Sequence, residues 1–122
     1  MKNIKTIVIV DDQYVEDLKI LIEKNNKANI KKIITFNSRE GFIKALTRGL
    51  EYDILLLDHG MPENLTIKNT KEFAEKYNPQ AIYILISNDI SDKNIQQILI
   101  QKYGFSEFID KKDCKEKLKK YL

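Results

Sequence analysis

The chain has 122 residues and a formal net charge of +3, with 43% hydrophobic and 32% charged residues. This length fits one globular domain, residues 1–122, and the composition excludes a disordered or low-complexity chain. The apolar runs are far shorter than the roughly 18 residues of a membrane span. Because the first run meets Asp11 and Asp12 at once, no secretory signal is expected. We therefore expect a cytoplasmic protein with no membrane partner.

Two further features of the composition have simple interpretations. The single cysteine, Cys114, cannot form an intramolecular disulfide and is expected as a free thiol in a reducing compartment. The segment 111–122 is rich in lysine, but aromatic residues do not interleave with the lysines as they do in a nucleic-acid surface. We expect a solvated terminal helix there, and no direct nucleic-acid partner.

The first half of the chain contains two short apolar runs, each followed by an amphipathic segment. The runs at 7–10 and 32–36 predict strands, and apolar residues at helical spacing predict a helix ending near residue 25. A second helix is expected after Ser38, a good N-cap residue, and is expected to end at Gly49. The predicted apolar faces are Tyr14, Leu18, Leu21 and Ile22 for the first helix, and Phe42, Ala45 and Leu46 for the second.

The second half repeats this alternation three times. Strands are predicted at 54–57, 81–86 and 105–109, with a last helix at 112–122. Between the strands we expect one helix that ends before Pro79 and another that runs from an N-cap at Ser91 to Gly104. Their predicted apolar faces are Phe73, Ala74 and Tyr77, then Ile95, Ile98 and Leu99, with Ile100 outside the face and exposed.

Five strand–helix units without hairpin signals predict an α/β fold. The strands are apolar throughout rather than alternating, which is typical of a parallel sheet covered on both faces. Right-handed crossovers then place helices on both sides of a doubly wound five-stranded sheet. In such a sheet, ligands bind beyond the carboxyl ends of the strands.

Polar residues end the predicted strands. Asp11 and Asp12 follow the first strand, and Asp58 follows the third. If these strands are neighbours, three carboxylates meet at one rim, where a divalent cation would compensate their repulsion. Oxygen ligands alone favour Mg²⁺ over Zn²⁺.

A hydroxyl and an ammonium flank the same rim. Ser87 follows the fourth strand and Lys111 follows the fifth. An aspartate can be the nucleophile in phosphoryl transfer, and a cation, an ammonium and a hydroxyl can hold the transferred group. The set of residues therefore indicates a phosphoryl group held on Asp58.

These residues resemble the motifs of response-regulator receiver domains, the phosphoacceptor modules of two-component signalling. The resemblance spans residues 5 to about 118. It rests on Val10-Asp11-Asp12, Leu57-Asp58-His59-Gly60-Met61-Pro62, Ile86-Ser87 and Phe108-Ile109-Asp110-Lys111. It implies a flavodoxin-like, CheY-like sheet with strand order 2-1-3-4-5, and a single receiver domain.

The resemblance also implies a role for each site residue. Asp58 would accept the phosphoryl group, Ser87 and Lys111 would bind it, and Phe108 would be the aromatic switch residue that moves with Ser87. The implied magnesium ligands are Asp11, Asp12, Asp58 and the carbonyl of Gly60.

The chain departs from the family pattern at three positions. Lys112 stands where a proline after a cis peptide bond is usual, and a non-proline cis bond costs roughly 2.5–4 kcal/mol. Asn88 replaces a small residue, and Asn64 lies where a glycine is common. His59, beside the acceptor, is interpreted as a loop residue. Metal ligation by His59 and a rarer receiver-like fold suspected of processing cyclic phosphates remain minor alternatives, the latter opposed by Gly60.

Three functions compete. A stand-alone receiver would take phosphate from a histidine kinase or a histidine phosphotransfer protein and signal through its fourth helix, fifth strand and last helix. A phospho-independent interaction module is the alternative, favoured by Asn88 and Lys112. An enzyme acting on phosphate esters usually has a second aspartate two residues after the nucleophile, where this chain has Gly60. We therefore expect no enzymatic activity beyond Mg²⁺-dependent self-phosphorylation and autodephosphorylation.

Overall fold

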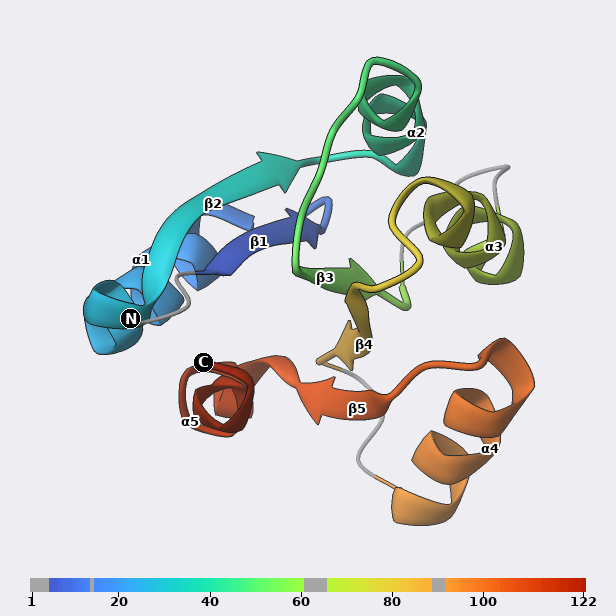
Figure 1. Cartoon of the computed structure of the whole chain (residues 1–122). Helices are drawn as coiled ribbons and strands as arrows, with labels where there is room; N and C mark the ends of the chain where they lie inside the picture. Colours follow the sequence, from blue (N-terminus) through green and yellow to red (C-terminus); the bar gives the residue numbers. More distant parts are fainter. Residues whose placement is uncertain (1–4, 14, 61–65, 89–91) are drawn as a thin grey trace.

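A computed structural model describes residues 5–13, 15–60, 66–88 and 92–122 (Figure 1). Strands and helices alternate along the chain, as predicted. The elements are β1 (Lys5–Val10), α1 (Val15–Asn26), β2 (Ile30–Phe36), α2 (Arg39–Thr47), β3 (Ile54–Asp58), α3 (Ile67–Tyr77), β4 (Ile82–Ser87), α4 (Lys93–Tyr103), β5 (Glu107–Asp110) and α5 (Cys114–Lys117). Short 3₁₀ turns cover Lys27–Asn29, Lys111–Asp113 and Leu118–Tyr121.

The five strands form one parallel sheet in the order β2-β1-β3-β4-β5. This confirms the predicted doubly wound fold and its strand order. In β1, Val10 pairs with Phe36 of β2 on one side and with Leu57 of β3 on the other. The carboxyl ends of β1 and β3 are therefore neighbours at the centre of the sheet, as the prediction of the site required.

Helices cover both faces of the sheet (Figure 1). Side chains of a strand point alternately to its two faces. Ile7 and Ile9 pack in the core on the α1/α5 side, whereas Val8 and Val10 pack in the core on the α2/α3 side. The same alternation holds along β3 and β4, so each strand contributes to both cores.

The α1/α5 core contains the single cysteine. Cys114 is fully buried and is a free thiol. Burial raises the pKa of this thiol to about 12, with a further contribution from the negative charge of Asp110. The thiol therefore stays protonated at neutral pH.

Caps set the helix ends largely as predicted. Ser38 caps α2 by accepting a hydrogen bond from Gly41 N at 3.0 Å, and Gly104 ends α4 with a φ of 74°. Asp92 is the N-cap of α4, because its side chain accepts hydrogen bonds from Asn94 N and Ile95 N. The cap predicted at Ser91 lies outside the described residues.

The predicted apolar face of α4 is wrong at Ile95, Ile98 and Ile100 and right at Leu99. Ile95 and Ile98 are 46% and 61% exposed, while Ile100 packs against the core instead of facing solvent. The α4 sequence carries two overlapping stripes at helical spacing, and the one through Gln96, Leu99, Ile100 and Tyr103 faces the protein. α4 packs against β5 and α3, and these contacts select the buried stripe.

Other helices deviate less from the prediction. In α1, Leu18 and Ile22 are buried as expected, but Leu21 is exposed, and Tyr77 of α3 is exposed as well. The predicted last helix is one α-helical turn flanked by two 3₁₀ turns. Across the described ranges, no helix combines the length and apolarity that crossing a bilayer requires.

Candidate functional site

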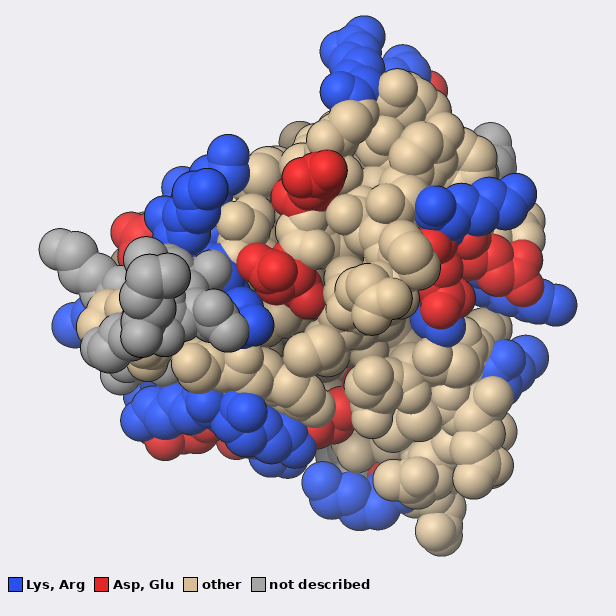
Figure 2. All heavy atoms as spheres, viewed as in Figure 1, with Lys and Arg blue, Asp and Glu red and all other residues tan. Residues whose placement is uncertain are grey.

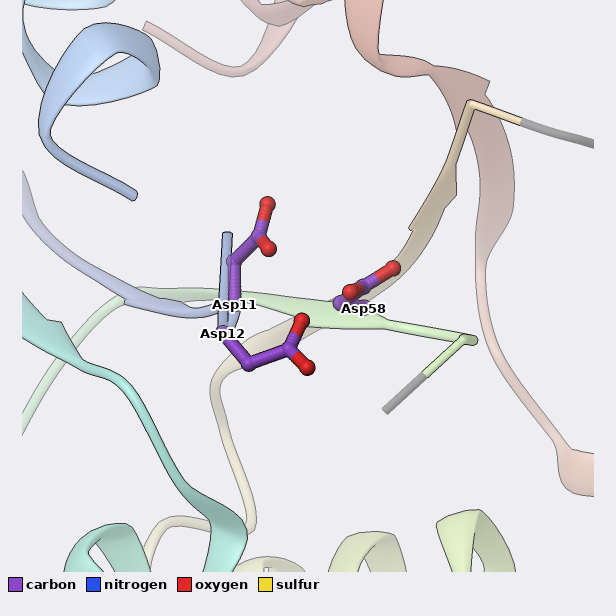
Figure 3. Close-up of side chains that lie close together, drawn as sticks. All are labelled: Asp11, Asp12 and Asp58. Atoms are coloured by element: carbon purple, nitrogen blue, oxygen red, sulfur yellow. The ribbon is translucent and has the colours of Figure 1, made fainter. Parts of the chain in front are cut away.

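Three carboxylates meet at the carboxyl ends of β1 and β3. One oxygen of each of Asp11, Asp12 and Asp58 lies within 4.8 Å of the others. Figure 3 shows Asp11 and Asp12 at the end of β1, with Asp58 facing them from β3. Asp11 and Asp58 are buried and Asp12 is exposed, so the cluster opens to solvent on one side. The predicted convergence of these three residues is confirmed.

Lys111 joins this cluster from the turn after β5. Its Nζ atom lies 2.7 Å from Asp11 Oδ2 and 3.4 Å from Asp58 Oδ1. The alternation of side chains along the strands explains why Lys111 reaches the two aspartates. Three residues of β1, β3 and β5 pack in the α1/α5 core: Ile9, Leu56 and Ile109. Two residues after these positions come Asp11, Asp58 and Lys111. Their side chains therefore lie on the same side of the sheet.

The turn after β3 orients the Asp58 carboxyl group. Gly60 N donates a hydrogen bond to Asp58 Oδ1 at 3.2 Å, and His59 N donates to the carbonyl of Ile86 at 2.9 Å. Gly60 is exposed and His59 is half-buried. The described cluster of metal-ligating side chains consists of the three aspartates and does not include His59.

Burial and charge act in opposite directions on Asp58. Desolvation raises the pKa of its carboxyl group above the ordinary value, and the negative charge of Asp11 adds to this. The Lys111 ammonium and the Gly60 N–H lower the same pKa, but by less. For Lys111, burial lowers the pKa, but the hydrogen bond to Asp11 and the charge of Asp58 outweigh it, so the net pKa is raised. Lys111 is therefore a stable ammonium at neutral pH.

The residues of this rim fit a divalent cation. The donors are carboxylate oxygens at mutual distances that one ion can bridge, which is the ligand chemistry of Mg²⁺. One ammonium cannot neutralise three carboxylates, so the rim keeps an attraction for further positive charge. Asp11, Asp12 and Asp58 would hold such an ion, with Asp12 on the solvent side.

Two other predicted residues lie at the ends of β4 and β5. Ser87 is buried at the last position of β4, where it pairs in register with Asp110. Phe108 is buried in the α2/α3 core, beneath α4. Their roles in binding a phosphoryl group and in switching remain predictions.

The departures from the family pattern have modest structural effects. Asn88 is exposed beside the rim and lines a shallow cavity of about 200 Å³ together with Lys111 and Lys112. Lys112 is exposed, and the described residues contain no cis peptide bond, so the turn after Lys111 is trans throughout. Asn64 lies outside the described residues, as do Met61 and Pro62.

The sequence analysis missed a buried arginine beside the turn that follows β3. Arg39, the first residue of α2, donates hydrogen bonds to the carbonyls of Asp58 and His59. Its one sequence signal is its position, since the first turn of a helix favours acidic residues over basic ones. On the face in Figure 2, other basic side chains lie in separate groups and form no continuous patch.

Comparison with known proteins gives matches in structure alone. No family model and no curated protein matches the sequence. A CheY-like response regulator receiver domain protein from Methanospirillum hungatei is similar, with a TM-score of 0.73 and 19% identity, over 97% of this chain and 93% of that one.

The chain has the fold of response-regulator receiver domains. Two further receiver-fold structures are similar. The RcsB response regulator of Salmonella typhimurium matches with a TM-score of 0.74 and 18% identity, over 97% of this chain and 57% of that one. The receiver domain of the histidine kinase CKI1 from Arabidopsis thaliana, solved with Mg²⁺ and BeF₃⁻, matches with a TM-score of 0.68 and 21% identity, over 89% and 82%.

Proposed function

We propose that this chain is a response-regulator receiver that accepts a phosphoryl group on Asp58 in a Mg²⁺-dependent reaction. The observation that carries the proposal is the cluster of Asp11, Asp12 and Asp58, buried at Asp11 and Asp58, with the Lys111 ammonium 3.4 Å from Asp58 Oδ1. This arrangement occurs on a receiver fold, at the edge of the sheet where ligands of such folds bind. The phosphoryl donor would be a histidine kinase or a histidine phosphotransfer protein.

The chemistry needs one nucleophile and several positive groups. An oxygen of the ionised Asp58 carboxylate would attack phosphorus, and the bond from phosphorus to the leaving group would break, with the electron pair leaving on that group. The product is an acyl phosphate on Asp58. The Lys111 ammonium is placed to offset the charge of the transferred group, and Gly60 N holds the attacking carboxylate in one orientation. Bound Mg²⁺ would supply further charge neutralisation.

The signal would leave through the surface of α4, β5 and α5. New bonds from the phosphoryl group to Ser87 and Lys111 would bias two arrangements of this surface. Ile95 and Ile98 of α4 are exposed apolar side chains on it, and they are suited to contact a protein target. We place this signalling in the cytoplasm.

The phospho-independent interaction module is the second candidate. The exposed Asn88 beside the rim and Lys112 in the trans turn support it, because both depart from the family pattern. The paired Asp58 and Lys111 oppose it. A chain that had lost the chemistry would have no need to keep an ammonium buried against two carboxylates.

Phosphorylation by a small donor tests the proposal. With acetyl phosphate and Mg²⁺, the intact mass of the protein should rise by one phosphoryl group, and Asp58→Ala should abolish the increase. Glu51→Gln, an exposed carboxylate near the opposite end of β3, is the matched control and should behave as the wild type. An unchanged wild-type mass would favour the interaction module, and turnover of a phosphate ester would favour an enzyme.

A further inference from the structure

Arg39 is a buried arginine whose position local helix stability does not explain. It is the first residue of α2, and only 3% of its surface is exposed. The positive end of the helix dipole opposes a cation at this position. Burial of a guanidinium also costs free energy unless its donors are hydrogen-bonded. The reason for Arg39 must therefore lie in what it contacts.

The guanidinium of Arg39 reaches the backbone at the carboxyl end of β3. Its Nη2 atom donates to the carbonyl oxygen of Asp58 at 3.3 Å and to that of His59 at 3.5 Å. Both hydrogen bonds are long, but the donor is charged, and charge strengthens a hydrogen bond. One side chain thus holds two successive carbonyls of the acceptor turn.

These two carbonyls belong to the peptide units that orient the acceptor. A peptide unit is planar, so the carbonyl of one residue and the N–H of the next move together. The unit with the Asp58 carbonyl carries His59 N, which donates to Ile86 O at 2.9 Å. The unit with the His59 carbonyl carries Gly60 N, which donates to Asp58 Oδ1 at 3.2 Å. Arg39 therefore binds the carbonyl group of both peptide units. The N–H of the first unit fixes the turn to β4, and the N–H of the second unit fixes the Asp58 carboxylate.

We propose that Arg39 is a positioning residue for phosphoryl transfer, holding the two peptide units after Asp58 so that the Gly60 N–H meets the Asp58 carboxylate. This inference rests on the proposed function of Asp58 as the phosphoacceptor. Arg39 acts through the backbone of the turn, and Lys111 acts on the carboxylate itself. Transfer to a correctly held carboxylate is fast because the orientation of the nucleophile is fixed before the reaction.

Three variants separate positioning from general stability. Arg39→Met keeps an unbranched side chain and removes every donor, while Arg39→Lys keeps the charge but replaces the planar fork with a single ammonium. Arg48→Met is the matched control, because Arg48 is an exposed arginine at the C-cap of the same helix. If Arg39→Met does not fold, Arg39→Lys serves in both measurements, with smaller effects in the same direction.

Amide hydrogen exchange tests the hold on the turn without Mg²⁺ or a phosphoryl donor. In Arg39→Met, the amides of His59 and Gly60 should exchange about tenfold faster than in the wild type. The amides of Val8 and Ile9 in β1 should not change, and Arg48→Met should match the wild type throughout. Unchanged exchange at His59 and Gly60 would overturn the proposal, as would an equal increase at all four amides.

Phosphorylation kinetics test the consequence for the reaction. At saturating Mg²⁺, Arg39→Met should lower the maximal rate with acetyl phosphate about tenfold and leave the half-saturating concentration nearly unchanged. Arg39→Lys should recover part of the rate. A maximal rate equal to that of the wild type would overturn the role in transfer. If the wild type itself takes no phosphoryl group, the proposed function fails, while the exchange experiment still decides whether Arg39 holds the turn.

Discussion

Lys111 and Asp11 form an almost fully buried ion pair. Nζ lies 2.7 Å from Asp11 Oδ2, with 9% of the lysine side chain and none of the aspartate side chain exposed. The ammonium reaches Asp58 less closely, at 3.4 Å. Lys111 therefore contacts one of the carboxylates that would hold a divalent cation, and the two cations would compete for it.

Removing this ammonium should strengthen Mg²⁺ binding. Lys111→Met frees Asp11 Oδ2 and removes a like charge from the rim, so we expect the Mg²⁺ affinity to rise by about tenfold, measured by titration calorimetry. Lys112→Met is the control, because that lysine is exposed and pairs with Asp110 at 3.8 Å. An affinity that is unchanged in Lys111→Met, or raised equally in Lys112→Met, would show that the two cations do not compete.

The raised pKa of Asp58 makes stability depend on pH. Because the carboxyl pKa is higher in the folded than in the unfolded protein, the folded state binds more protons between the two values. The free energy of unfolding should therefore fall as the pH rises from about 4 through this interval. Asp58→Asn removes the group, so urea unfolding should show a more stable protein at neutral pH and a weaker fall. Glu51→Gln should show the same decrease in stability with pH as the wild type. The prediction is contradicted if Asp58→Asn is less stable than the wild type at neutral pH.

Two buried tyrosine hydroxyl groups link the segment before β3 to β4 and to the C-cap of α3. Tyr83 OH donates to Asn78 O at 2.9 Å and lies 3.0 Å from Tyr52 OH. Burial raises the pKa of both tyrosines, that of Tyr83 to about 12, so both stay protonated. Both of these hydrogen bonds involve Tyr83 OH and only one of them involves Tyr52 OH, which also interacts with the side chain of Asn78.

Phenylalanine substitutions should reveal this difference. We expect Tyr83→Phe to lower the free energy of unfolding by about 2 kcal/mol and Tyr52→Phe by about 1 kcal/mol, measured in urea. Tyr77→Phe, at an exposed tyrosine, should change it little. The reverse order of the two buried variants would show that the hydrogen bonds do not control the loss.

Two glycines with positive φ allow backbone strain to be separated from steric contact. Gly49 has a φ of 95° and open space around its missing Cβ, whereas at Gly104, with a φ of 74°, a Cβ would lie 2.9 Å from Lys71 Nζ. Gly49→Ala should cost about 1 kcal/mol of stability from strain alone, and Gly104→Ala more.

A double-mutant cycle with Lys71→Met tests the source of the extra cost. In the Lys71→Met background, the stability loss from Gly104→Ala should fall to the value found for Gly49→Ala. Thermal unfolding of the four variants measures it. If the loss at Gly104 stays the same without the ammonium, the contact with Lys71 contributes nothing.

The core strands could be predicted because their signals are local and agree with one another. The runs in β1, β3 and β4 are apolar throughout and are buried on both faces. Side-chain facing in α4 could not be predicted, because its two apolar stripes overlap and only contact with the sheet selects between them. Its buried stripe includes Gln96, which hydrophobicity alone places on the outside.

The acidic rim could also be predicted, because the strand-end rule and the strand order place Asp11, Asp12, Asp58 and Lys111 together. Arg39 could not, since its partners are backbone carbonyls of β3 and the turn that follows it. Every residue has a backbone carbonyl, so no pattern of residue types indicates which carbonyl an arginine will bind. Only its unfavourable place at a helix N-terminus marked it out.

The buried thiol of Cys114 can report how often the C-terminal segment separates from the rest of the protein. The thiolate is the form of cysteine that attacks alkylating reagents, and a fully buried thiol with a pKa of about 12 offers almost none of it at neutral pH. Labelling can therefore occur only while α5 is separated from α1. The labelling rate therefore records how often the C-terminal segment detaches, and Mg²⁺ added to the same assay would show whether the strand-end rim and this segment open together.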